Sequence, residues 1–104
     1  MILVTKTFTR PNTDVKFHYE VLNNEEFKNH MKSKYYETGK VVSENKKLDE
    51  TNLSFTYSGV WKTRADFDEH DTDPVLQKYW DSRDAYNNQN NIVASERTFS
   101  EVDL

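Results

Sequence analysis

The residue of this chain best suited to chemistry is His70, because an imidazole titrates near neutral pH and can accept or donate a proton. It follows Trp61 along the chain and lies in an expected helix that begins at Thr63. In one interpretation His70 is a catalytic base or orients a substrate. In the other it packs against Trp61 and hydrogen-bonds to the backbone, closing the corner between a strand and a helix. The sequence leaves both interpretations open.

A row of aromatic side chains precedes His70 on one face of the clearest strand in the chain. Residues 53–61 alternate, so that Phe55, Tyr57 and Trp61 share a face. Such a row could stack against a flat aromatic ligand, which makes these residues candidates for substrate binding. Rows of this kind also form ordinary hydrophobic cores, so a structural role is the alternative.

Several other kinds of site are excluded or not expected. The chain has no cysteine, so it has no disulfide, no thiolate nucleophile and no cysteine-bound metal or cluster. It has no Gly-rich phosphate loop and no Ser-centred nucleophile elbow. His18 and His30 lack metal-ligand spacing, so no metal site is expected, and both are predicted to be exposed or half-buried. The acidic residues are predicted to form a solvated surface, with Asp66 and Asp73 also suited to helix N-termini.

Length and composition predict one small folded domain over residues 1–104. Only 35% of the residues are hydrophobic, but 13% are aromatic and they recur at regular spacings, which disordered chains lack. The low apolar content suggests that a partner subunit completes the core.

Charge and hydropathy narrow the range of partners. The chain has 14 basic and 18 acidic residues and a formal net charge of -4, so nucleic acid is not an expected partner. No stretch approaches the ~18 apolar residues of a membrane-spanning helix. The first ten residues lack the pattern of a signal peptide, so we expect a cytoplasmic location without membrane contact.

Alternation of apolar and polar residues predicts the strands that position the candidate residues. The predicted strands are 2–9, 40–48, 53–61 and 92–99, with 14–21 a short strand or extended arm. The tail, residues 101–104, is predicted to be frayed or exchanged with a partner.

Capping signals predict the helices. Asn23 and Glu26 resemble a capping box and Gly39 suits a helix end, which predicts a helix over 24–37. Further helices are predicted to begin at Thr63 and at Asp73, where Pro74 suits the first helical position. This order of elements predicts an α+β fold of ferredoxin-like βαββαβ topology, an antiparallel sheet with two helices on one face.

The segment from Trp61 to Pro74 has a pattern of residue types, in addition to its order of elements, that can be compared with a known family. A strand ends in Trp61, a helix with an alanine and His70 follows, and Pro74 comes next. This order resembles the signature of the antibiotic biosynthesis monooxygenase-like (ABM-like) family of dimeric α+β barrels. The resemblance covers residues 52–80 in detail and 24–100 in topology.

The resemblance implies a homodimer that packs its two sheets face to face, with a pocket between sheet and helices. It implies a cofactor-free monooxygenase- or isomerase-like enzyme acting on a small hydrophobic or aromatic molecule. The site residues that it implies are His70 as the catalytic residue and Trp61, Phe55 and Tyr57 as substrate-binding residues.

Two departures from the family pattern leave a second function open. The haem-degrading branch has an asparagine on the first strand, where this chain has Thr5 and Thr7, so haem degradation is not expected. The segment 14–21 also lies outside the pattern, and the richness in Asn, Lys and Asp resembles small phage-encoded proteins. The alternative function is a non-catalytic dimeric binding or assembly module, such as a phage accessory protein. A filled interface between sheet and helices favours this alternative, whereas an open pocket reaching His70 favours an enzyme.

Overall fold

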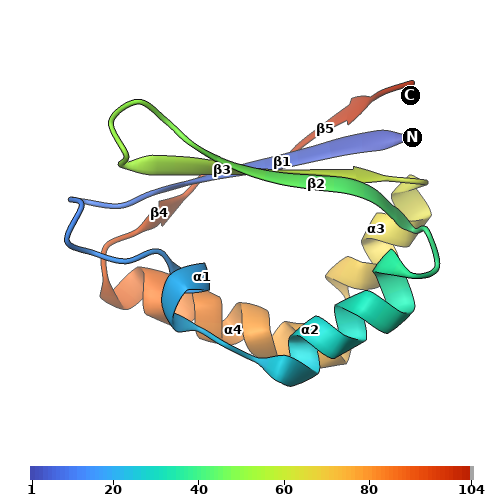
Figure 1. Ribbon diagram of the computed structural model, residues 1–104, viewed down its shortest axis with the longest axis horizontal. Helices are drawn as coiled ribbons and strands as arrows, with labels where there is room; N and C mark the ends of the chain where they lie inside the picture. Colours follow the sequence, from blue (N-terminus) through green and yellow to red (C-terminus); the bar gives the residue numbers. More distant parts are fainter. Residues whose placement is uncertain (104) are drawn as a thin grey trace.

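The computed structural model describes residues 1–103, which form an antiparallel sheet with helices on one face (Figure 1). The strands are β1 (Ile2–Thr9), β2 (Val41–Leu48), β3 (Ser54–Trp61), β4 (Val93–Ala94) and β5 (Thr98–Glu101). The helices are α1 (His18–Val21), α2 (Glu25–Met31), the π-helical turn η1 (Lys32–Tyr36), α3 (Arg64–Asp71) and α4 (Pro74–Gln89). The sheet order β2-β3-β1-β4, with β5 also paired to β1, confirms the predicted ferredoxin-like α+β fold. None of the helices in the described part of the chain is long and apolar enough to cross a membrane.

The strand register gives the sheet two chemically different faces. Phe8 of β1 pairs with Phe55 of β3, and these large side chains share the face toward the helices. The next pair, Thr7 and Thr56, lies on the other face, where the two hydroxyl groups hydrogen-bond at 2.8 Å. The helices cover only the first face, which leaves the hydroxyl-rich face uncovered by this chain (Figure 1).

The hydrophobic core is divided into two clusters at opposite ends of the inner face. One cluster consists of Ile2, Val4, Met31, Tyr35, Val41, Trp61, Phe67 and Leu76. The other consists of Phe8, Phe17, Phe55 and Ile92. Between them, the inward positions of β1, β3 and β2 hold Lys6, Tyr57 and Lys46, which are register partners across the sheet. The middle of the inner face is therefore polar.

The prediction of a strand or extended arm at 14–21 is wrong, because residues His18–Val21 form the short helix α1. The backbone N–H of Phe17, the N-cap, donates to the Glu20 carboxylate at 2.8 Å. This is the second half of a capping box, and it stabilises a helical turn. Phe17 is 1% exposed and belongs to a core cluster, so the alternating apolar residues here reflect packing of a turn against the sheet.

The predicted helix at 24–37 is present with two differences. Its N-cap is Asn24, one residue later than predicted, and the Asn24 side chain accepts a hydrogen bond from the Phe27 N–H at 3.0 Å. Its second half, η1, widens to a π-helical turn. The predicted end is confirmed, because Gly39 has a φ of 77°, a conformation that glycine adopts at little cost.

The predicted strand at 92–99 is interrupted. Its two parts, β4 and β5, both pair with β1, and the chain between them bulges out at residues 95–97. The Thr7 N–H donates to the Ser95 hydroxyl at 2.9 Å, which satisfies the backbone of β1 at the break. Of the tail predicted to be frayed or exchanged, Val102 is bonded within the chain, because its N–H donates to the Met1 carbonyl at 3.0 Å. Leu104 lies outside the described residues.

Asp73 joins helix α4 to the segment α2–η1. The predicted N-cap role is confirmed, because Oδ1 accepts from the Val75 N–H at 3.0 Å. The predicted exposure is wrong: Asp73 is 4% exposed, and Oδ2 accepts from the Tyr35 hydroxyl (2.7 Å), His30 Nε2 (2.7 Å) and Lys34 Nζ (3.2 Å). Burial alone would raise the pKa of Asp73, but these hydrogen bonds together outweigh it and hold the pKa well below its usual range.

The substitution Asp73→Asn should lower the free energy of unfolding by about 3 kcal/mol at pH 7, since it removes the buried charge that four donors share. Urea denaturation measures the loss, and Asp14→Asn, on an exposed loop, should change little. Because the pKa of Asp73 is lower in the folded than in the unfolded state, its contribution is complete above the ordinary value of 3.8 and is lost as the pH falls below it. The difference between wild type and Asp73→Asn should shrink in that acidic range, and a constant difference would contradict this account.

Candidate functional site

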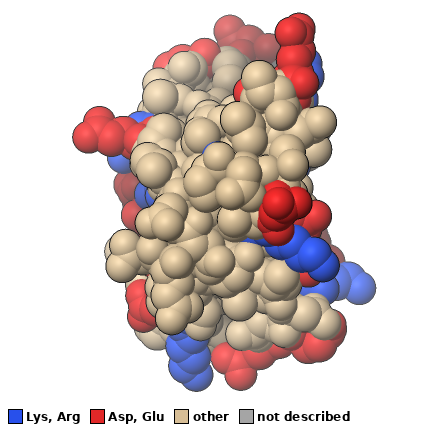
Figure 2. Space-filling model, turned by 90° about the vertical axis from the view of Figure 1, so that its left-hand side faces the viewer, with Lys and Arg blue, Asp and Glu red and all other residues tan. Residues whose placement is uncertain are grey.

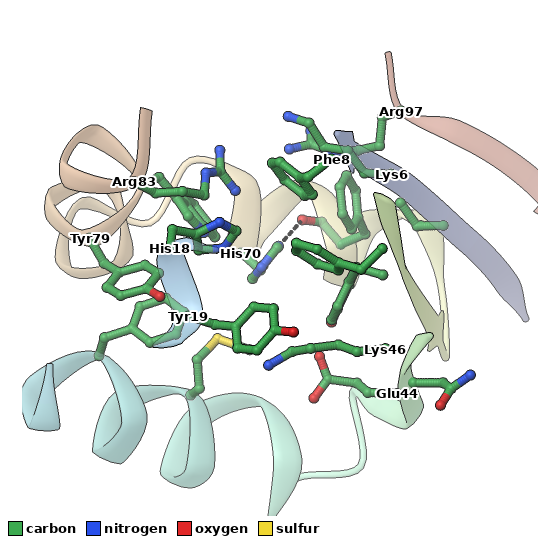
Figure 3. Close-up of a pocket in the computed structure, with 18 of the residues that line it drawn as sticks. Lys6, Phe8, His18, Tyr19, Glu44, Lys46, His70, Tyr79, Arg83 and Arg97 are labelled. Atoms are coloured by element: carbon green, nitrogen blue, oxygen red, sulfur yellow. Dashed lines mark hydrogen bonds between the residues drawn. The ribbon is translucent and has the colours of Figure 1, made fainter. Parts of the chain in front are cut away.

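A cavity of about 390 Å³ lies between the sheet and the helices (Figure 3). It is lined from both core clusters, so it occupies the region where they do not meet. All four site residues predicted from the sequence line it: Phe55, Tyr57 and Trp61 from β3 and His70 from α3. The interface between sheet and helices is therefore open at His70.

Aromatic side chains also form the helical wall of the cavity. Phe27 of α2 stacks on Tyr79 of α4, with ring centroids 4.1 Å apart. Trp80 of α4 lies beside His70, with a centroid distance of 4.7 Å. With the β3 row opposite, the cavity has aromatic walls on two sides, which suits a flat organic ligand.

Gly59 keeps the sheet side of the cavity from being filled by another side chain. It is buried on the inward face of β3, and a Cβ at this position would lie 3.2 Å from the Tyr57 hydroxyl and 3.3 Å from Trp61 Nε1. The glycine thus leaves room for the polar tip of each neighbouring aromatic side chain close to its backbone.

His70 closes the corner as one interpretation holds, and it also lines the cavity. Its ring packs on Trp61 with centroids 4.5 Å apart, and Nδ1 lies 3.3 Å from the Phe67 carbonyl. Because that carbonyl can only accept, Nδ1 carries the proton and Nε2 is left as an acceptor. Burial lowers the pKa of His70 to about 4, against the smaller raising effect of the hydrogen bond. His70 closes the strand–helix corner and is also a neutral, weak base on the cavity.

Two buried polar groups on the cavity have no hydrogen-bond partner among residues 1–103, namely Trp61 Nε1 and His18 Nδ1. The prediction that His18 is exposed or half-buried is wrong: it is 7% exposed, because α1 turns its ring against Phe8. Burial, together with the nearby Arg83 and Lys46, lowers the pKa of His18 to about 4. A buried polar group without a partner costs ~1–3 kcal/mol, so both groups are unfavourable features of the cavity wall.

Four basic residues of the cavity were not identified from the sequence: Lys6, Lys46, Arg83 and Arg97. Lys6 points inward from the middle of β1, and Arg83, on α4, has a side chain that is only 13% exposed. Arg97 lies in the bulge between β4 and β5, and its guanidinium donates to Asp71 at 3.0 Å. One signal was readable, because Lys6 interrupts the apolar face of the strand at 2–9.

The part of the chain that the structure describes brings no three histidine or acidic side chains together in a way that could hold a metal ion. The polar groups of the cavity are instead distributed among aromatic walls. This arrangement suits an organic ligand that is held by its rings and oriented by a few polar contacts.

Comparisons with known proteins bear on the fold. No protein-family model matches the sequence, and no curated protein is significantly similar to it. Among solved structures, the chain is similar to SnoaB, a cofactor-independent oxygenase from Streptomyces nogalater, with a TM-score of 0.61 and 11% identity over 99% of this chain and 93% of that chain. It is similar to an antibiotic biosynthesis monooxygenase (TM-score 0.62, 10% identity, 100% of both chains) and to Rv0793 from Mycobacterium tuberculosis (TM-score 0.55, 11% identity, 100% of this chain and 98% of that one). At these identities the likeness shows the fold alone, and it confirms the ABM-like fold.

The imidazoles of His70 and His18 should both titrate with midpoints near pH 4, and the neutral form of His70 should carry its proton on Nδ1. Nitrogen-15 NMR of the histidine side chains measures both the midpoints and the tautomer. Since both folded pKa values lie below the ordinary 6.5, these groups should also make the protein less stable as the pH falls from 6.5 toward 4. Midpoints near 6.5 would show that the two rings are hydrated and not buried.

Proposed function

We propose that this protein is a cofactor-free, monooxygenase-like enzyme that acts on a small aromatic molecule bound between the sheet and the helices. The observation that carries the proposal is an open cavity of about 390 Å³ whose aromatic walls lead to a neutral histidine. In this proposal Phe55, Tyr57 and Trp61 contact the flat substrate and His70 is the base. The likeness to a cofactor-independent oxygenase supports it at the level of fold.

In the proposed reaction, Nε2 of His70 accepts a proton from an activated C–H of the substrate, and the resulting carbanion gives its electrons to O₂. A methylene group of the substrate becomes a carbonyl, one oxygen atom stays in the product and the other leaves as water. The substrate supplies all the electrons, so no added reductant is needed. A base with a pKa of about 4 removes only an acidic proton, so the substrate must stabilise its carbanion through adjacent rings or carbonyls. The protein contributes positioning and exclusion of bulk water.

We further propose that the chain functions as a homodimer joined through the hydroxyl-rich face of the sheet. No helix of residues 1–103 covers this face (Figure 1). It carries the partly buried apolar residues Leu3 and Val60, which are direct partners in the β1–β3 register. A second sheet would bury these side chains and supply the apolar contacts that the low hydrophobic content of the chain leaves missing.

Anthrone is a suitable probe for the proposed reaction, because two aromatic rings conjugated with a carbonyl acidify its methylene group. The wild-type protein should accelerate O₂ uptake by anthrone above the rate in buffer. The substitution His70→Asn should reduce this acceleration about 100-fold, since loss of a general base typically has an effect of that order. Oxygen electrode measurements and the absorbance of the quinone product give the two rates.

Asparagine is chosen because its side-chain amide can still donate to the Phe67 carbonyl, so the corner that His70 closes should stay folded. His70→Ala removes this bond as well and should cost ~1–3 kcal/mol of stability. Wild-type turnover by folded His70→Asn would show that His70 is not the base. Binding of anthrone without any acceleration of O₂ uptake would contradict the enzymatic proposal and favour the non-catalytic binding module.

A further inference from the structure

The cavity is lined by basic residues, although the chain as a whole carries a formal net charge of -4. Four cationic side chains line it, from β1, β2, α4 and the bulge before β5: Lys6, Lys46, Arg83 and Arg97. Glu44 is the single carboxylate among the described residues that line it. Figure 3 shows Lys6 and Arg97 together on one side of the cavity and Glu44 and Lys46 on another.

The arginines are only partly engaged by acidic partners. Arg83 contacts Asp84 through Nε at 3.0 Å, and Arg97 contacts Asp71 through Nη1 at 3.0 Å. Each guanidinium has five N–H donors in a planar fork, so most of the donors on each remain for another acceptor. Lys6 forms no ion pair within residues 1–103.

The basic groups lie close enough to act on one another. Burial lowers the pKa of Lys6, and Arg83 and Arg97 lower it further, with smaller opposing effects from acidic groups. The Lys6 ammonium and the Arg83 guanidinium lie 5.6 and 5.7 Å from the centre of the same ring, that of Phe8. Gathering like charges at a partly buried place is unfavourable unless an anion joins them.

Two uncharged polar groups of the cavity wall have no hydrogen-bond partner among the described residues. The indole Nε1–H of Trp61 can only donate, and it has no acceptor among the described residues although Trp61 is 0% exposed. His18 Nδ1 is likewise unpartnered, at 7% exposure. The Trp61 indole therefore adds an unpaired donor to the wall of the cavity.

Basic side chains are less concentrated on the outer face shown in Figure 2 than in the cavity. Figure 2 shows the end of the molecule that lies on the left in Figure 1, and most of the surface there is neither basic nor acidic. Basic side chains appear there mainly near the edges. On this face the positive charge is not concentrated, in contrast to the cavity.

We infer that the ligand of this cavity is an aromatic carboxylate whose rings lie between β3 and helices α2 and α4 and whose carboxylate contacts Lys6 and Arg83. The inference rests on the proposed function in that it uses the same cavity. Arginine matches a carboxylate because its fork can bond both oxygens, and Lys6 supplies a second charge from the sheet. The ring of Phe8 lies near both cations, at 5.6 and 5.7 Å, and is available to the aromatic part of the ligand next to the carboxylate.

The test compares two probes that share the same rings, 2-naphthoate and the neutral 2-naphthamide. Isothermal titration calorimetry gives both affinities for the full chain. Trp61 and Trp80 are its only tryptophans and both line the cavity, so intrinsic fluorescence reports where binding occurs. Wild-type protein should bind 2-naphthoate at least about tenfold more tightly than 2-naphthamide, since hydrogen bonds to charged groups are worth this much or more.

Two variants test whether cations of the cavity bind the carboxylate, and two control variants each remove a lysine outside the cavity. Lys6→Met and Arg83→Met should each weaken 2-naphthoate binding about tenfold and leave 2-naphthamide binding nearly unchanged. Lys47→Met, on β2 but paired with Thr56 of the opposite face, and Lys78→Met, on α4 with a side chain 74% exposed, should leave both affinities unchanged. Circular dichroism checks that each variant is folded, and retained 2-naphthamide binding shows that its cavity is intact.

The outcomes separate this inference from the proposed function. Equal affinity for the two probes would overturn the inference while leaving an aromatic-binding cavity in place. Equal losses in the Lys6 and Lys47 variants would also overturn it, because the effect would then be general surface attraction. If neither probe binds or changes the tryptophan fluorescence, the inference fails and the proposed function loses its ligand site as well.

Discussion

The rest of this structure depends on the separation between two aromatic clusters on one sheet. The register places Trp61 at one end of the inner face and Phe55 with Phe8 at the other. The positions between them belong to Lys6 and Tyr57, whose polar ends cannot be close-packed in an apolar core without losing hydration. The cavity is therefore a consequence of which residue types occupy the middle of the strands.

Helices α2 and α4 form the wall of the cavity opposite the sheet, and hydrogen bonds at Asp73 join them. The buried carboxylate of Asp73 caps α4 and accepts hydrogen bonds from the segment α2–η1. Helix α4 then spans both clusters, with Leu76 in one and Tyr86 packed against the other. This polar link holds the two parts of the helical wall to each other.

Much of the fold could be predicted from local signals, but the character of the site could not. The alternation at 53–61 and the caps at Thr63 and Asp73 are properties of short segments, and each was found in the structure. Helix α1 was missed because four residues are too few to show a helical period, and the burial of His18 was missed with it. Arg97 reaches the cavity through a break between β4 and β5 that depends on pairing with β1, which no local pattern shows.

The central claim is that the cavity receives an aromatic ligand, and the most direct test is a two-dimensional ¹H–¹⁵N spectrum of the tryptophan side chains. The chain has two tryptophans, so the indole region contains two signals, which substitution of Trp80 assigns. On addition of 2-naphthoate, the account predicts that the indole N–H signal of Trp61 shifts, because the rings of the ligand lie beside the aromatic row of β3 that ends in Trp61. An unchanged Trp61 signal, with shifts confined to exposed backbone groups, would contradict the account.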